Sequence, residues 1–126
     1  MVEDRITDGR RIAELLSSEL HGREDGALDR VAVVDADRDA EPSADGTLAY
    51  RLARSGDPFG EVFVHPERVR VELRSGLEAA AEAAEDAGLP VRPKAVDPPR
   101  TLIFVESGAE IKRAVDAIDA AAAADE

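Results

Sequence analysis

The chain has no cysteine among its 126 residues, and its only lysines are Lys94 and Lys112. Disulfide bonds and thiolate metal sites are therefore excluded, which suits a reducing compartment. Long apolar runs are missing as well: nowhere do roughly 18 apolar residues follow one another, and the N-terminal stretch is charged from residue 3 onward. Such a sequence predicts neither a signal peptide nor a membrane span. We expect a cytoplasmic protein without a membrane partner.

Cationic side chains are outnumbered, because 28 Asp and Glu face 16 Lys and Arg and give a formal net charge of −12. The arginines are interspersed with carboxylates along the sequence, so no clustered patch for phosphate backbones is predicted and we expect no nucleic-acid partner. Repulsion of this size destabilises a fold in dilute buffer, whereas at ~1 M salt the Debye length is ~3 Å and the repulsion is screened. The charge balance therefore predicts adaptation to high salt.

The chain is also rich in Ala, Asp, Glu and Arg, with alanine runs at 79–81 and 120–124. This composition resembles that of haloarchaeal proteins. The opening VEDRITDGRRIAELLSSEL is similar to the start of a small acidic haloarchaeal protein of an uncharacterised family. The resemblance implies a salt-accumulating cell and carries no functional motif.

The stretch 101–124 is the strongest structural signal. Residues 102–105, Leu-Ile-Phe-Val, are all large and apolar, which is typical of a strand buried on both faces. The apolar residues that follow have the spacing of one helical face: Ile111, Ala114, Val115, Ile118 and Ala122. The chain length fits a single domain, 1–126, that buries roughly two-thirds of the surface exposed by its unfolded chain.

Periodicity and turn residues predict the other elements in chain order. They are a helix from 7 or 8 to 22, strands at 31–34, 47–54, 61–65 and 68–74, and a helix from 75 to 88. The prolines between 90 and 99 predict an extended connector. The predicted fold is α+β in the order α-β-β-β-β-α-β-α, with a mostly antiparallel five-stranded sheet and helices packed mainly on one face. We expect 31–34 and 102–105 to be the central pair of strands.

Two strand-to-helix junctions share the pattern Ser-Gly-x-Glu, at 75–78 and at 107–110. The pattern predicts a capping box, in which the serine accepts from a helical N–H and the glutamate reaches back. A phosphate cradle at these helix starts is the alternative, but Glu78 and Glu110 would repel an anion. An internal duplication is a further alternative, although the flanking strands differ in their apolar pattern. We interpret both junctions as helix caps.

Asp35, Asp37 and Asp39 are the nearest approach to a cation site. In an extended chain alternate residues lie about 6.6 Å apart, so three carboxylates converge on an ion only if the chain turns. As an EF-hand loop the segment fails, because Ala40 stands at the glycine position and Gly46 at the glutamate position. The alternatives are a specific Mg²⁺ or Ca²⁺ site, loose cation association and a solvated acidic loop. We favour the loop and expect no metal or other cofactor.

His65, Glu67 and Tyr50 form the only set that suggests proton transfer. A catalytic histidine needs an orienting acid and a pocket, whereas a histidine in the short turn 65–67 is usually exposed. No nucleophile elbow, dinucleotide motif or P-loop is present. We therefore expect these residues to be non-catalytic, and name them as weak candidates.

The leading functional hypothesis is a non-catalytic cytoplasmic interaction module that forms homodimers and is adapted to high salt. Its motivation is that two strands look apolar on both faces, while three helices do not suffice to cover both faces of a five-stranded sheet. The alternative is a small-ligand-binding protein or small enzyme with a site near His65.

Overall fold

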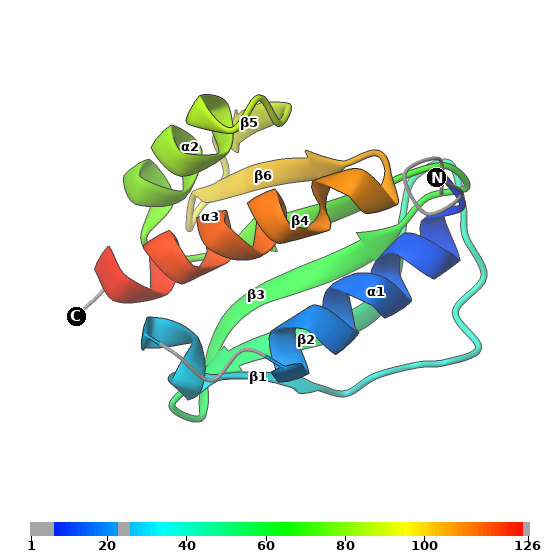
Figure 1. The fold of residues 1–126 in the computed structure, drawn as a ribbon, viewed down its shortest axis with the longest axis horizontal. Coiled ribbons are helices and arrows are strands. Elements are labelled where there is room, and N and C mark those ends of the chain that lie inside the picture. The colour runs from blue at the N-terminus through cyan, green and yellow to red at the C-terminus, as the bar shows by residue number, and fades with distance from the viewer. Residues whose placement is uncertain (1–6, 23–25, 125–126) are drawn as a thin grey trace.

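The computed structural model describes residues 7–22 and 26–124. Within these residues the protein is an α+β structure in two layers, with three α-helices on one face of a six-stranded antiparallel sheet (Figure 1). The helices are α1 (Gly9–Gly22), α2 (Leu77–Asp86) and α3 (Ile111–Ala124), and the strands are β1 (Val31–Val34), β2 (Thr47–Arg54), β3 (Asp57–Val64), β4 (Val69–Leu73), β5 (Val91–Lys94) and β6 (Arg100–Val105). Two short 3-10 helices, η2 (Gly26–Arg30) and η3 (Gly108–Glu110), precede β1 and α3.

The sheet has the strand order β1-β2-β3-β4-β6-β5, and every neighbouring pair is antiparallel. The predicted five-stranded sheet was one strand short. Residues 91–94 pair with β6 although they contain Pro93, which an edge strand tolerates because one side of it needs no ladder donors. The predicted α+β class and the helices on one face agree with the structure.

The predicted central pair of 31–34 and 102–105 is wrong. β1 lies at one edge of the sheet, and β6 lies next to the other edge, between β4 and β5. The centre is instead built from β3 and β4, in which Val62, Val64, Val69 and Val71 are buried. Apolar character on both sides therefore did not indicate a central position.

Helix α1 begins where the sequence predicts. The Asp8 carboxylate accepts a hydrogen bond from the Arg11 N–H at 3.2 Å, which is the capping interaction expected of an aspartate before the first turn. Ile12, Leu16 and Leu20 lie on one face of the helix and are buried against the sheet. This apolar stripe places α1 over β1, β3 and β4.

The two Ser-Gly-x-Glu junctions do not form the predicted capping boxes. At the first, Gly76 is the N-cap residue, in the left-handed conformation with φ 63°, and no side chain caps α2. At the second, Ser107 makes no side-chain cap, while the Glu110 carboxylate accepts from the Glu106 N–H at 2.8 Å. The shared sequence pattern therefore has a different cause at each junction. At the first, the left-handed backbone at Gly76 favours glycine; at the second, the Glu110 carboxylate accepts from an N–H that precedes the helix.

Helix α3 is the centre of the helical layer. It packs against α2, α1, η2 and β6, and it buries small residues at its contacts, among them Ala114, Ala117, Ala121 and Ala122. Alanine lets neighbouring backbones approach closely, so the alanine-rich composition is used here for packing within the chain. Ala117 and Ala121 are both buried, so they add no outer surface to α3.

Candidate functional site

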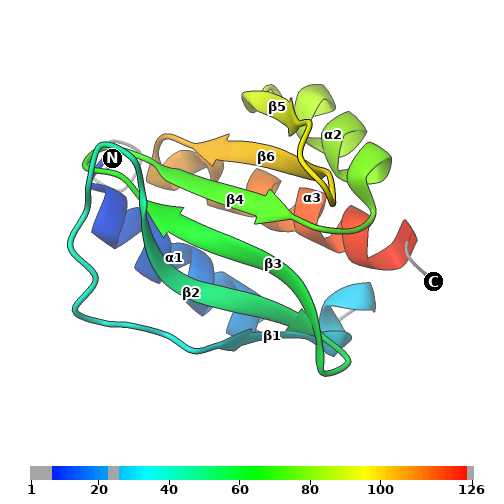
Figure 2. The same ribbon diagram turned by 180° about the vertical axis from the view of Figure 1, so that it is seen from behind.

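Among the described residues no helix packs on the face of the sheet turned away from α1, α2 and α3 (Figure 2). Directly opposite residues on antiparallel neighbours share a face, so the strand register identifies the side chains on this surface. One row crosses five strands in the order Arg51, Glu61, Glu72, Leu102 and Arg92. We call this surface the uncovered face.

A second row on the uncovered face runs Phe63, Arg70 and Phe104. The Arg70 guanidinium carbon lies 4.4 Å from the centre of the Phe63 ring, and that of Arg68 lies 4.4 Å from the centre of the Phe104 ring. Each phenylalanine is thus covered by an arginine in a cation–π contact. The aromatic rings support the arginines rather than standing open to solvent.

Glu72 organises the middle of the uncovered face. Its carboxylate is only 1% exposed and is surrounded by three cations on three strands. Arg70 Nε donates to it at 2.8 Å, Arg100 Nη1 donates at 2.9 Å, and Lys94 Nζ lies 3.7 Å away. Burial alone would raise the pKa of Glu72, but the hydrogen bond from Arg100 and the charges of Lys94 and Arg70 outweigh it and lower the pKa.

Glu61 extends this cluster toward β2. Arg100 Nη1 also donates to Glu61 at 2.9 Å and so bridges two carboxylates, while Arg74 Nη2 lies 3.2 Å from the other Glu61 oxygen. The Nε atoms of Arg74 and Arg100 are buried and have no hydrogen-bond partner within the described part of the chain. The carboxylates of Glu61 and Glu72 therefore hold four cationic side chains in place, while two of the arginine N–H groups keep no hydrogen-bond partner among the described residues.

His65, predicted to lie in an exposed turn, is only 5% exposed. Its Nδ1 is 3.0 Å from the Ala44 carbonyl oxygen, and its Nε2 is 3.0 Å from Arg70 Nη1. Because arginine can only donate, Nε2 accepts and Nδ1–H donates, which fixes the neutral tautomer. Burial and the nearby charges of Arg70 and Arg68 lower the pKa of His65, against the opposing effect of the Ala44 hydrogen bond.

The structure does not bring the predicted proton-transfer set together. The Tyr50 hydroxyl donates to the Ala13 carbonyl oxygen of α1 at 2.9 Å, so the tyrosine belongs to the helix-covered face, and burial raises its pKa strongly. His65 contacts the loop at Ala44 and Arg70 of the uncovered face. Glu67 is exposed in the turn after β3. Both ring nitrogens of His65 are engaged in structural hydrogen bonds.

The lowered pKa of His65 predicts a pH dependence of stability. Below the unfolded-state pKa of about 6.5 the unfolded chain takes up a proton that the folded chain refuses, so stability falls as pH falls from that value toward the folded pKa. We expect the free energy of unfolding to decrease between about pH 7.5 and 5.5, by at most about 1.4 kcal/mol per pH unit from this group. Chemical denaturation at several pH values should show a shallower slope for His65→Gln than for the wild type. Equal slopes in the two proteins would contradict the assignment.

The acidic triplet forms a turn rather than a cluster. The Asp37 carboxylate accepts from the Asp39 N–H at 3.0 Å, and the Asp37 N–H donates to the Ala49 carbonyl oxygen at 2.8 Å. Asp35, with φ 53°, turns the chain directly after β1, and all three aspartates are exposed. Among the described residues no group of three His, Asp or Glu side chains is placed to hold a metal ion.

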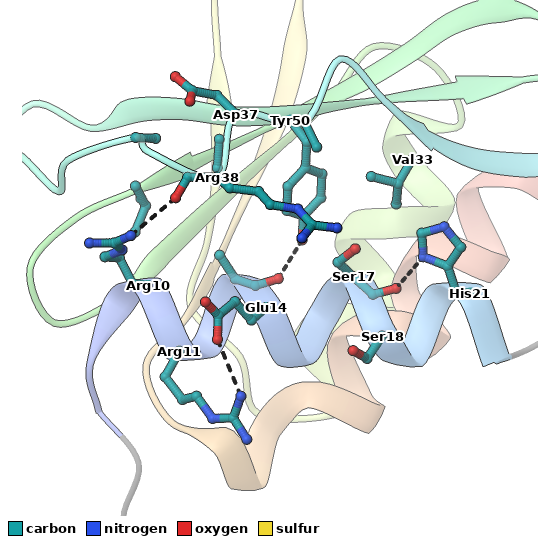
Figure 3. A pocket seen from close by; sticks show the side chains of 15 residues that line it. Arg10, Arg11, Glu14, Ser17, Ser18, His21, Val33, Asp37, Arg38 and Tyr50 are labelled. Atoms are coloured by element: carbon teal, nitrogen blue, oxygen red, sulfur yellow. Dashed lines mark hydrogen bonds and ion pairs between the residues drawn. The ribbon is translucent and has the colours of Figure 1, made fainter.

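A hollow of about 580 Å³ lies between α1 and the segment 36–40. Its floor is apolar, with Val33, Ala49 and Val64, and its rim carries Arg10 and Arg38 among other polar residues. Figure 3 shows the Arg38 side chain running across the hollow above α1. Arg10 Nη2 donates to the Arg38 carbonyl oxygen at 3.0 Å, which ties this segment to the helix.

A second hollow, of about 610 Å³, lies at the end of β3 and is lined by His65, Glu67, Arg68 and Glu106 together with Thr7, Ala44 and Pro66. Of the predicted proton-transfer set, His65 and Glu67 line this depression, whereas Tyr50 lines the first hollow. His65 contributes its ring to the wall, but its two nitrogens are held by Ala44 and Arg70. The depression offers Glu67 and Glu106 as acidic groups and Arg68 as a cation.

The two edges of the sheet differ in their chemistry. The edge strand β5 contains Arg92, Pro93 and Lys94, and charges and proline at an edge oppose pairing with another chain. The other edge strand, β1, has the sequence Val-Ala-Val-Val and contains neither charge nor proline. The Ser55 N–H donates to the Arg30 carbonyl oxygen, so the backbone groups of residue 30 point toward β2. Successive residues of a strand direct their backbone N–H and C=O groups to alternate sides, so those of Val31 and Val33 point away from β2, toward the open edge.

The uncovered face was missed from the sequence because its members are far apart in the chain. Alternation of Val69, Val71 and Leu73 with Arg70 and Glu72 is local information and indicates one outward row on β4. That this row continues on β3, β2, β6 and β5 depends on strand order, which the sequence pattern does not contain.

Comparisons with known proteins add a family and no function. A family model described as a family of unknown function (DUF7993) matches residues 1–126. Neither the curated proteins nor the solved structures gave a match. Among the described residues no helix has the length and apolar character needed to cross a membrane.

Proposed function

We propose that this chain, which belongs to the family of unknown function DUF7993, is a non-catalytic interaction module that forms homodimers by pairing the β1 strands of two copies. The observation that carries the proposal is the open β1 edge, with outward backbone groups at Val31 and Val33 and no charge or proline to oppose pairing. Two copies related by a two-fold axis would form one continuous antiparallel sheet. The cysteine-free, strongly acidic composition supports a cytoplasmic setting with high salt.

The side chains of β1 fit this mode of association. Val34 is 37% exposed and, by its register with Arg51, lies on the uncovered face, beside the open edge. Val31 and Val33 are half-buried on the opposite side and pack against the core. A second β1 would bury more of these apolar side chains while it satisfies the edge backbone groups.

The placement of the proton-transfer candidates supports a non-catalytic role. Tyr50 and His65 make their hydrogen bonds on opposite sides of the sheet, to Ala13 and to Ala44. A general base also needs a free ring nitrogen, and both nitrogens of His65 have partners. A small-ligand site near His65 stays a prediction, for which the depression lined by Glu67 and Arg68 is the available place.

Substituting Val34 by lysine should convert the dimer into a monomer. A lysine at the edge places two like charges at the contact of two β1 strands, and it removes an apolar side chain from the interface. Light scattering after size-exclusion chromatography in molar KCl should give a dimer mass for the wild type and a monomer mass for Val34→Lys.

Val96→Lys is the matched control, because among the described residues Val96 is the other exposed large apolar side chain, at 45%, and it lies outside β1. It should remain dimeric. A second variant, Val33→Pro, removes an N–H directed at the open edge without taking a hydrogen bond from β2, so its effect should not depend on salt. A monomeric wild type, or dimers in both Val34→Lys and Val33→Pro, would refute the proposed interface.

A further inference from the structure

The uncovered face concentrates cations in a chain that is acidic overall. Its described strands and their flanking residues bring seven cationic side chains to this surface: Arg51, Arg68, Arg70, Arg74, Arg92, Lys94 and Arg100. Within the same rows the register places two carboxylates, those of Glu61 and Glu72, and Glu106 follows at the rim. The whole chain, in contrast, has a net charge of −12. The fold therefore gathers onto one face cations that are interspersed with carboxylates along the sequence.

The inner cations Arg70 and Arg100 are held in place before any partner arrives. Arg70 is fixed by Glu72, by the Asp45 carbonyl oxygen at 3.1 Å and by the Phe63 ring. Arg100 is fixed between Glu61 and Glu72. Ordered guanidinium groups lose less conformational entropy on binding than free ones, so such an array favours recognition of carboxylates.

The chemistry of the uncovered face fits a protein partner better than a nucleic acid. Leu102 and Phe104 on β6 lie beside arginines of this face, and apolar side chains next to arginines have the composition of a protein interface. Single-stranded nucleic acids bind to sheets by stacking bases on open aromatic rings, whereas Phe63 and Phe104 are covered by Arg70 and Arg68.

A second copy of the same face is a poor occupant, since two surfaces with an excess of arginine repel each other. Arg51 and Arg92 lie at the two ends of one row, on β2 and β5, which are separated by four strand spacings or roughly 19 Å. Both are exposed. A partner that pairs with both needs carboxylates about this far apart, as on a short acidic helix or extended segment.

We infer that the uncovered face is a docking site for an acidic segment of another protein, with Arg51 and Arg92 as its outer contacts. The cluster around Glu72 supplies a fixed positive field, and the outer arginines form bidentate pairs with partner carboxylates. This site lies on the face of the sheet and is separate from the β1 edge, so it does not depend on homodimerisation. A monomeric Val33→Pro protein should keep it, because the Val33 side chain lies on the opposite face of the sheet.

The test uses fluorescein-labelled poly-L-glutamate as an acidic polypeptide probe and measures its anisotropy with increasing protein at two KCl concentrations. The double variant Arg51→Gln, Arg92→Gln should bind the probe at least about tenfold more weakly than the wild type, which corresponds to modest losses at each exposed arginine. The double variant Arg11→Gln, Arg113→Gln changes net charge equally on the helical layer, also at exposed positions, and should bind within about twofold of the wild type.

Circular dichroism at both salt concentrations verifies that every variant is folded. Equal weakening by the two double variants would show attraction to net charge alone and would overturn the site. Absence of poly-L-glutamate binding would overturn it as well, and so would tighter binding of poly-uridylate RNA than of poly-L-glutamate. Loss of the dimer in Val33→Pro with unchanged probe binding would support both proposals independently.

Discussion

Replacing Gly76 by alanine should lower the free energy of unfolding by about 2–5 kcal/mol. Gly76 adopts φ 63° at the start of α2, a conformation that costs an alanine about 1–2 kcal/mol. An added Cβ would also overlap the backbone carbonyl of Ala121 in α3. Because backbone atoms cannot rotate away, the two helices would have to separate.

Gly56→Ala is the matched control for this prediction. Gly56 also has a positive φ, of 87°, in the turn between β2 and β3, but a Cβ there would meet nothing within 4 Å. It should therefore show the conformational cost alone, about 1–2 kcal/mol. Chemical denaturation of both variants in molar KCl measures the difference. Equal losses would mean that α2 and α3 do not pack as closely as the structure shows.

The Gly76 contact also shows where sequence reasoning stopped. The Ser-Gly-Leu-Glu pattern correctly indicated that a helix starts near residue 76, because serine, glycine and glutamate are common at helix starts. The reason for the glycine is a contact with α3, about 45 residues later in the chain, and no local pattern can encode it. Helix existence was predictable, and the tertiary reason for its first residue was not.

The bounds of the strands could likewise be predicted from local sequence, whereas their order in the sheet could not. The alternating and apolar runs predicted β1, β2, β4 and β6 close to their observed bounds, since these patterns depend on neighbouring residues alone. The order of strands depends on contacts between distant segments, so the apolar run of β1 was wrongly placed at the centre. β5 was missed because Pro93 argued for a connector, although an edge strand accepts proline.

The candidate sites show this limit most clearly. Outward Arg70 and Glu72 were predictable from alternation in β4, but Arg100 and Lys94 join them from strands that follow α2. His65 was expected in solvent, because a three-residue turn is usually exposed. It is buried because the loop before β2 folds over it and supplies the Ala44 carbonyl oxygen.

Removing the negative charge of Glu72 by substitution with glutamine should lower the free energy of unfolding by about 3–5 kcal/mol. The carboxylate is buried among Arg70, Arg100 and Lys94, and its loss leaves three cations without their shared counterion. The glutamine NH₂ group would also face donors, because arginine and lysine side chains offer no acceptor. The exposed Glu67 provides the control, and Glu67→Gln should cost less than about 0.5 kcal/mol in the same denaturation experiment.

The effect of salt on stability should differ between this buried cluster and the charges on the surface of the chain. Exposed charges more than a Debye length apart are screened in molar KCl, whereas a carboxylate that is 1% exposed and in direct contact with its partners is screened much less. The loss caused by Glu72→Gln should therefore remain when KCl is raised from the lowest concentration at which the protein is folded to molar levels. A loss that disappears with salt would mean that water reaches Glu72. The cluster could then not hold the arginines of the uncovered face in fixed positions for a partner.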